Sequence, residues 1–185
     1  MQPKSKNGNE EVRNKVLHLV KKTDSEEHPK HPDKPKVWTY EELAEELSYS
    51  EPYLRAIAED LVVSSINHGR KYIIWKGHFE EIADRYGFIS IDGIIFHEKD
   101  DTKSVLKYLA KKKDAGLLPE DVKEQLDRTC YRPLNELVEN GPLVKEKVYN
   151  KTVYFHENRK EIQHKNRISN KRLEPEVPEE PDGKQ

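Results

Sequence analysis

The stretch that decides the fold is LPEDVKEQLDRTCYRPLNELVENGPLVKEKVYNKTVYFH, residues 118–156. Pro119 suits the first turn of a helix, and Val122 and Leu126 form an apolar pair four residues apart, which places both on one helical face. Polar residues 127–129 interrupt this pattern. The sequence therefore predicts a short helix followed by a tight turn.

A second short helix follows the turn. Leu134, Leu137 and Val138 mark its apolar face. Asn140-Gly141-Pro142 ends it, because glycine takes the left-handed cap and proline cannot continue a helix.

Two strands complete the stretch. Leu143–Val148 and Thr152–Phe155 flank a polar turn at 149–151, which predicts a hairpin. Thr102–Lys113 has helical spacing and precedes the whole stretch. The expected order is helix, helix, tight turn, helix, hairpin.

The same order is expected upstream. Its elements are a helix from Glu10, a short strand at Val37-Trp38, a helix opened by a capping box at Thr39–Glu42, a helix from Ser50 and a hairpin over Ser64–Trp75.

The two regions align as an internal repeat. A shift of 80 places Leu54 on Leu134 and Trp75 on Phe155. Convergent apolar spacing is an alternative explanation. The strand positions and the tight turn agree as well, however, so we expect a two-fold repeat.

Between the repeats, His78–Tyr86 is expected to be a short helix with Ile82 facing inward. Ile89–Phe96 forms a hairpin around Asp92-Gly93, since Asp-Gly is a strong hairpin signal. An apolar hairpin cannot stand alone in water, so we expect it to pack between the repeats and fix their orientation.

Charge is distributed unevenly. Residues 1–100 hold 15 Lys/Arg against 19 Asp/Glu, residues 101–172 hold 17 against 11, and residues 173–185 hold 1 against 5. The second repeat and its extension are therefore the electropositive part of a chain whose net charge is −2.

This order of elements, with the YIIW and VYFH strands at 72–75 and 153–156, resembles tandem winged-helix proteins of the transcription-regulator-like kind found in prokaryotes, archaea included. Chain endings similar to VYFHENRKEIQHKNRISNKR, a wing strand followed by a charged helix, are found in archaeal forms, some of them associated with mobile elements. The resemblance implies sequence-specific binding of double-stranded DNA without a cofactor, through the third helix and the wing.

The expected fold is α+β and mostly helical, with two tandem winged-helix domains joined by a short helix and a β-hairpin. The expected parts are a disordered start (1–9), winged-helix domain 1 (10–76), the connection (77–100), winged-helix domain 2 (101–156), a basic extension that is a solvated helix or a basic arm (157–173) and a disordered acidic tail (174–185).

The candidate DNA-binding residues lie in the second repeat. Arg132 and Asn135 face away from the apolar stripe, and their side chains suit guanine and adenine edges respectively. The other candidates are Arg128 and Tyr131 at the entrance of the third helix, Lys123 on the second helix, and Lys145, Lys147 and Lys151 on the wing, where lysines reach phosphates.

Plainer explanations exist for the same residues. A solvated helix face can carry arginine and asparagine, and lysines on strand edges protect against aggregation. Pro133 is awkward for a helix, so the third helix is expected to start as late as Arg132.

The first repeat is acidic, with EELAEEL at 41–47. Phosphate repels such a surface, so this repeat is expected to form a homodimer contact, through its first helix or long loop, or to bind a protein partner. A second hypothesis for the whole chain follows: a protein-interaction module built from tandem winged helices, as in chromosome-segregation or transcription-machinery subunits.

Catalytic, cofactor and metal motifs are not found. His28 and His31 lack further ligands at zinc spacing, and Cys130 has no assignable catalytic partners. We therefore expect neither an enzyme nor a metal or cofactor site. With one cysteine and no long apolar run, the chain is expected to be cytoplasmic and not bound to a membrane.

Overall fold

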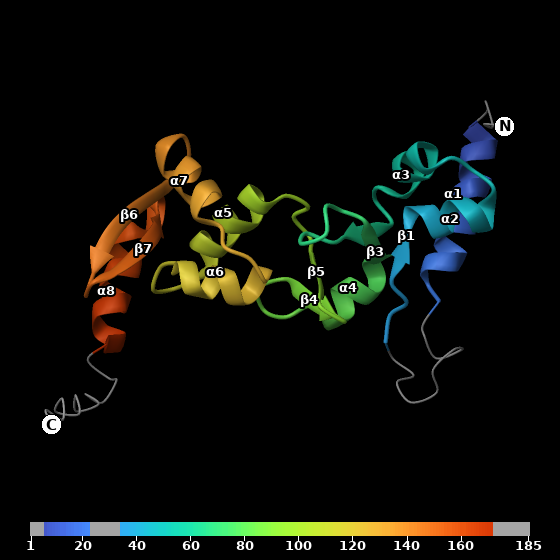
Figure 1. Ribbon diagram of the computed structural model, residues 1–185. Coiled ribbons are helices and arrows are strands. Elements are labelled where there is room, and N and C mark those ends of the chain that lie inside the picture. The colour runs from blue at the N-terminus through green and yellow to red at the C-terminus, as the bar shows by residue number, and fades with distance from the viewer. Residues whose placement is uncertain (1–5, 23–33, 172–185) are drawn as a thin grey trace, which may run out of the picture. The chain divides into compact units, whose positions relative to one another are not determined.

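The computed structural model describes residues 6–22 and 34–171. The fold is α+β, with about half of these residues in helices and the strands in small antiparallel sheets (Figure 1). The expected acidic tail at 174–185 and much of the proline-containing loop after the first helix lie outside the described residues.

The chain divides into two compact units. Unit 1 is Met1–Val105 with Glu124–Arg128, and unit 2 is Leu106–Lys123 with Thr129–Gln185. The boundaries pass through α5 (Thr102–Lys112) and α6 (Pro119–Leu126), so each of these helices is shared.

Unit 1 begins with three helices and a three-stranded sheet. Its elements are α1 (Lys6–Val20), β1 (Trp38–Thr39), α2 (Tyr40–Leu47), α3 (Glu51–Ala58), β2 (Val62–Ser64) and β3 (Tyr72–Trp75). β3 lies in the middle of the sheet, antiparallel to both β1 and β2. Trp38, Leu43, Leu54 and Ile73 are buried in the core that joins the sheet to the helices.

The expected capping box at the start of α2 is present. The Thr39 hydroxyl accepts a hydrogen bond from the Glu42 amide (3.1 Å), and the Thr39 amide donates to the Glu42 carboxylate (2.6 Å). α1 begins at Lys6, before the expected start at Glu10, so the expectation of disorder is wrong for residues 6–9. The Tyr53 hydroxyl donates to Asn9 Oδ1 (2.8 Å) and anchors this additional turn.

The connecting segment packs as part of unit 1. It contains α4 (Lys76–Ile82), β4 (Phe88–Ile91) and β5 (Ile94–His97), and Asp92 and Gly93 form the expected two-residue turn with positive φ. Phe79, Ile89 and Phe96 are buried against Val63 and Ile74 of the first sheet. The hairpin therefore does not stand apart as a separate connection, because its apolar strands are buried by the neighbouring sheet of unit 1.

One expectation for this segment is wrong. Ile82 does not face inward, since its side chain is 48% exposed. α4 ends at Ile82, so the residue lies in the last turn, and Phe79 is the buried residue of the helix. A further contact joins the hairpin to the first sheet: Ser65, which follows β2, forms an antiparallel bridge with Phe96 of β5.

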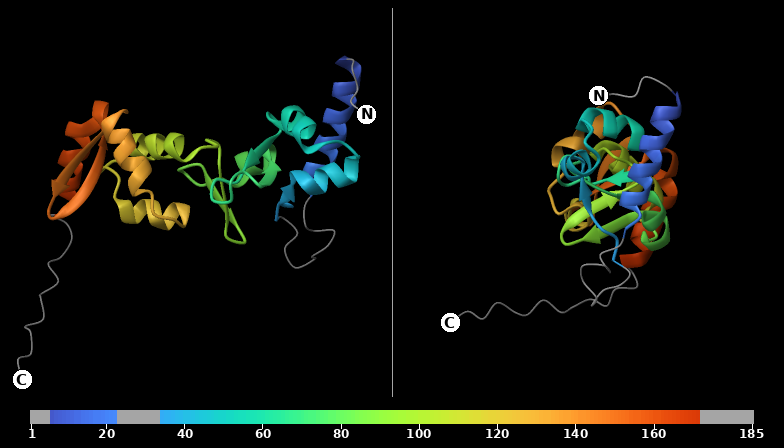
Figure 2. Two further views of the ribbon diagram at one scale, coloured as in Figure 1. Left: turned by 45° about the horizontal axis from the view of Figure 1, so that its top comes forward. Right: turned by 90° about the vertical axis from the view of Figure 1, so that its right-hand side faces the viewer.

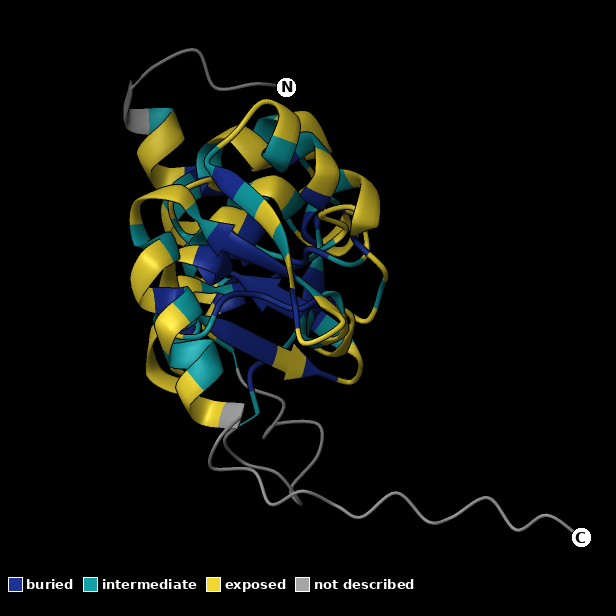
Figure 3. Ribbon diagram, turned by 90° about the vertical axis from the view of Figure 1, so that its left-hand side faces the viewer, coloured by how far each residue is buried: buried dark blue, intermediate teal, exposed yellow. Residues whose placement is uncertain are grey.

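Unit 2 contains the second set of elements. After the parts of α5 and α6 that belong to it come α7 (Tyr131–Glu139), β6 (Leu143–Val148), β7 (Lys151–His156), the 3-10 helix η2 (Glu157–Arg159) and α8 (Lys160–Lys171). β6 and β7 pair antiparallel over their whole length, and Leu117 forms a bridge to Tyr154 on β7. A buried cluster is formed by Leu118, Val148, Val153 and Phe155. Figure 3 shows buried residues along the strands in dark blue.

Two glycines of unit 2 are required for different reasons. Gly116 has a φ of +77°, and a Cβ there would lie 2.7 Å from side-chain atoms of Val153 and Phe155. Gly141 does not form the expected left-handed cap. A Cβ on Gly141 would lie 2.8 Å from the Leu137 carbonyl oxygen, so close approach of the backbone is the reason for glycine.

The extension after β7 is a helix packed on unit 2 (Figures 1 and 2). Its anchor is Gln163, which is fully buried. Gln163 Nε2 donates to the carbonyls of Ala110 and Lys113 (2.6 Å each), and Oε1 accepts from the His156 amide (3.0 Å). The sequence left two forms open for this extension, a solvated helix or a basic arm. Its described residues are helical, as η2 followed by α8.

Candidate nucleic-acid interface

α7 presents an apolar face to unit 2 and a polar face to solvent. Leu134 and Leu137 are buried, whereas Tyr131, Arg132 and Asn135 are exposed. The helix starts at Tyr131, so Pro133 lies in the first turn, where a backbone N–H has no helical acceptor and proline is tolerated. The expected late start at Arg132 is therefore off by one residue.

Arg132 is the most accessible cation of this face. Its side chain is 90% exposed, and its Nε donates to Glu136 Oε1 at 3.0 Å, one helical turn away. This ion pair orients the guanidinium through Nε. The two terminal amino groups, which form the fork used against guanine or phosphate, are not part of it.

Asn135 is held by two residues of the β6–β7 hairpin. Its Oδ1 accepts hydrogen bonds from Lys145 Nζ and from the Tyr154 hydroxyl, each at 3.3 Å. The Lys145 ammonium also lies 5.8 Å from the centroid of the Tyr154 ring. Burial raises the pKa of the Tyr154 phenol, and the neighbouring Tyr131 raises it further, so the hydroxyl keeps the proton that it donates.

The β6–β7 hairpin carries a surplus of positive charge. Lys145, Lys147 and Lys151 are exposed. The one carboxylate of β6, on Glu146, is paired with Lys160 of α8 at 2.5 Å. The turn between the strands consists of Tyr149 and Asn150, both with positive φ, as a two-residue hairpin turn requires.

Two further candidates occupy different places. Lys123 is exposed on α6 in unit 2. Arg128 does not lie on the α7 face, because it belongs with unit 1, where its Nη2 donates to the Ile66 carbonyl (3.1 Å) and to the Thr102 hydroxyl. The guanidinium of Arg128 thus makes structural hydrogen bonds within unit 1, and its expected part in DNA contact stays a prediction.

Sequence reasoning missed three residues that build this surface. Tyr154 supports Asn135, Lys160 neutralises Glu146, and Gln163 fixes α8. The sequence pattern predicts that Tyr154 lies on a strand. No sequence signal, however, identifies the helix residue that a buried tyrosine contacts.

Comparison with protein-family models, with curated proteins and with solved structures gave no match.

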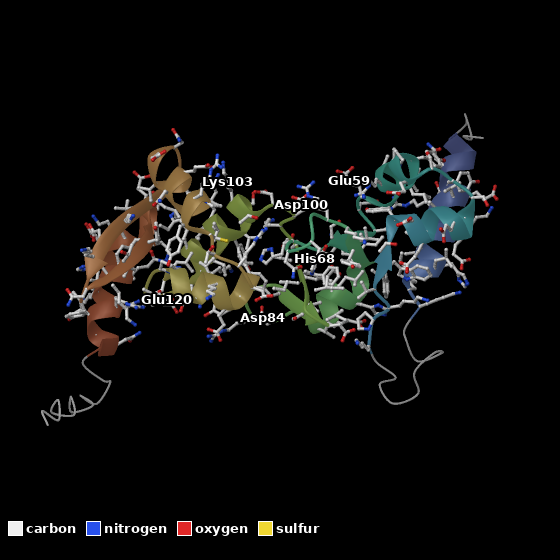
Figure 4. All side chains as sticks on the ribbon, in the orientation of Figure 1. Glu59, His68, Asp84, Asp100, Lys103 and Glu120 are labelled. Atoms are coloured by element: carbon white, nitrogen blue, oxygen red, sulfur yellow. The ribbon has the colours of Figure 1, made fainter. Side chains whose placement is uncertain are left out.

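Unit 1 offers a surface of different character. Its α2 carries four glutamates, and Arg55 of α3 is used internally, with its guanidinium 4.1 Å from the Tyr40 ring centroid. An open pocket of about 560 Å³ lies on this unit, with Glu59 and Asp100 among its lining residues (Figure 4). The basic side chains that line the pocket are balanced by carboxylates. Arg70 Nη2, for instance, lies 3.2 Å from Asp100 Oδ2. This surface lacks the surplus of positive charge that phosphate requires.

The described residues contain no group of three or more histidine, cysteine or acidic side chains placed to hold a metal ion. His28 and His31 lie outside these residues. Cys130 is buried at the start of α7. Within the same described part of the chain, none of the helices has the length and apolar character needed to cross a membrane.

Proposed function

We propose that the chain is a non-enzymatic DNA-binding protein made of two winged-helix domains, and that its second domain reads duplex DNA with α7 and the β6–β7 wing. Supporting the fold, the order helix, short strand or bridge, helix, helix, hairpin occurs twice along the chain. In each, the short strand or bridge pairs with the last strand of the hairpin. The repeat expected from apolar spacing has this same order.

One observation carries the functional proposal. The exposed face of α7 holds Arg132 and Asn135, and Asn135 is hydrogen-bonded to a lysine of the wing, so base-reading and phosphate-binding side chains form one continuous surface. Phosphate contacts give affinity, and base contacts give specificity. Binding of this kind, without catalysis, fits a transcriptional regulator or a factor associated with mobile elements.

The experiment is a fluorescence-anisotropy titration of the full chain on a labelled random duplex, repeated at several salt concentrations. Binding at low salt with a linear fall of log K against log salt is expected, because lysines and arginines displace counterions from DNA. The double variant Lys147→Ala/Lys151→Ala should bind more weakly, with a shallower slope.

A second candidate is a protein-interaction module, favoured by the acidic surface of unit 1. The same titration separates the two functions. If the wild-type chain does not bind duplex DNA at low salt, the DNA-binding proposal fails and the interaction module is the better account.

A further inference from the structure

The contacts of Asn135 determine which end of its amide faces solvent. Lysine carries three hydrogen-bond donors and no acceptor, so only the oxygen of an amide can meet Lys145 Nζ. The Tyr154 hydroxyl meets the same oxygen. The amino group of Asn135 therefore lies on the other side of the amide carbon, away from both donors.

Arg132 and Asn135 are three residues apart on α7, so they are neighbours on one helical face. Arg132 presents the terminal amino groups of its guanidinium, and Asn135 presents its amino group. Both side chains therefore offer donors outward, and the acceptor of the asparagine amide is already occupied by two donors from the protein.

We infer that this face recognises guanine in the major groove, through the N7 and O6 acceptors of the base. The inference rests on the proposed DNA binding and names its base preference. Guanine presents two acceptors there, whereas adenine presents one acceptor beside one donor. The usual asparagine–adenine contact needs both ends of the amide, so the adenine preference expected from the sequence for Asn135 gives way to guanine.

Lys145 thus has a part beyond charge. It orients Asn135, together with Tyr154, and is a positioning residue for base recognition. Lys147 lies two residues further along β6 and is also exposed, but it makes no described contact with Asn135, so it provides a matched control for loss of one wing charge.

The test begins with selection of binding sites from a random duplex library by the full wild-type chain, followed by anisotropy measurements on the selected duplex. Each guanine in turn is replaced by 7-deazaguanine, which keeps base pairing but lacks the N7 acceptor, or its pair is changed to A·T. At one guanine or more, both changes should weaken wild-type binding, roughly 5- to 150-fold for A·T.

The double variant Lys145→Met/Tyr154→Phe removes both hydrogen-bond donors from Asn135 Oδ1. It should reduce the ratio of the affinity for the guanine duplex to the affinity for the adenine duplex at that position. The control Lys147→Met should weaken binding to the guanine and adenine duplexes equally, so the ratio of the two affinities should not change. Tyr154→Phe alone removes only a hydroxyl, so it provides a well-folded second variant expected to narrow the ratio to a smaller degree.

Selected sites with adenine at the contacted position, or equal binding of guanine and 7-deazaguanine throughout, would overturn the inference while leaving DNA binding intact. An unchanged ratio in the Lys145→Met/Tyr154→Phe variant would overturn the positioning part. If the chain binds no duplex at low salt, both this inference and the proposed function fail.

Discussion

At the scale of single residues, the proposed DNA binding assigns Arg132 to base contact and Lys151 to phosphate contact, and a simple loss of binding would not distinguish the two roles. Arg132→Ala should cost about 1–3 kcal/mol on the preferred site and relax the sequence preference there, because the forked guanidinium is lost. Lys151→Ala should weaken binding about equally on all sequences and lower the salt slope by about one, because a point charge near phosphate is lost. Paired titrations on a selected and an unrelated duplex measure both effects. Identical behaviour of the two variants would indicate a generic positive surface.

His97 is expected to make the stability of unit 1 depend on pH. Its side chain is buried on β5, and burial lowers the pKa of its imidazole, as burial also does for His78. The folded state therefore prefers the neutral ring. Stability should be full above the unfolded pKa, about 6.5, and should fall as the pH drops below it, by at most about 1.4 kcal/mol per pH unit for each such histidine.

Both tryptophans, Trp38 and Trp75, belong to unit 1, so urea unfolding followed by tryptophan fluorescence reports on this unit. The midpoint should fall between pH 7.5 and 5.5 in wild type and fall less in His97→Phe. The exposed His18 provides a control, and His18→Gln should behave as wild type. Equal loss in wild type and His97→Phe would show that other groups cause the pH dependence.

At the scale of elements, α8 depends on one buried amide. Gln163→Leu would leave the carbonyls of Ala110 and Lys113 and the His156 amide without their side-chain partner, at a cost of about 2–4 kcal/mol in the free energy of unfolding. Denaturation followed by far-ultraviolet circular dichroism measures this. Ile162→Ala, which changes a neighbouring side chain that is 59% exposed, is the matched control and should cost little. Similar small losses in both variants would contradict the anchoring role.

Local signals in the sequence predicted most elements. The Thr39–Glu42 capping box and the Asp92-Gly93 turn are present as expected, because each depends on side chains and dihedral angles within four residues. α7 also lies where its apolar stripe placed it. Such features are local, so the sequence alone determines them.

Features that depend on distant partners were not predictable in the same way. Arg128 meets Ile66 and Thr102, and Gln163 meets the end of α5, contacts that span many residues of sequence. Asn135 was recognised as a candidate reader, but the orientation of its amide depends on Lys145 and Tyr154 of the wing. Pattern and spacing proposed the candidate residues, and tertiary contacts decide which atoms each of them exposes.

At the scale of the whole molecule, the two units differ in charge. The net positive charge of residues 101–172 lies in unit 2, and the acidic α2 lies in unit 1. The segment 77–100, expected as a separate connection, is instead part of unit 1, since its apolar strands are buried there. Each unit thus contains buried clusters of its own.

Dimerisation through unit 1 stays a prediction. Palindromic DNA sites require two-fold symmetry of the protein, and the acidic unit is the one less suited to DNA. Sedimentation equilibrium should detect a dimer of the full chain, and substitutions on the exposed face of α1 should weaken it, because the first helix or the long loop is the expected contact. A monomer at high concentration, with and without DNA, would contradict it.

The most direct test of the central claim is a titration of the isotope-labelled full chain, 21.8 kDa, with a short duplex, followed residue by residue by amide chemical shifts. We predict that the shifts concentrate on α7 and on the β6–β7 hairpin, and that α2 and α3 of unit 1 are unaffected at the first additions. Shifts confined to unit 1, or no shifts at low salt, would contradict the assignment of DNA binding to unit 2.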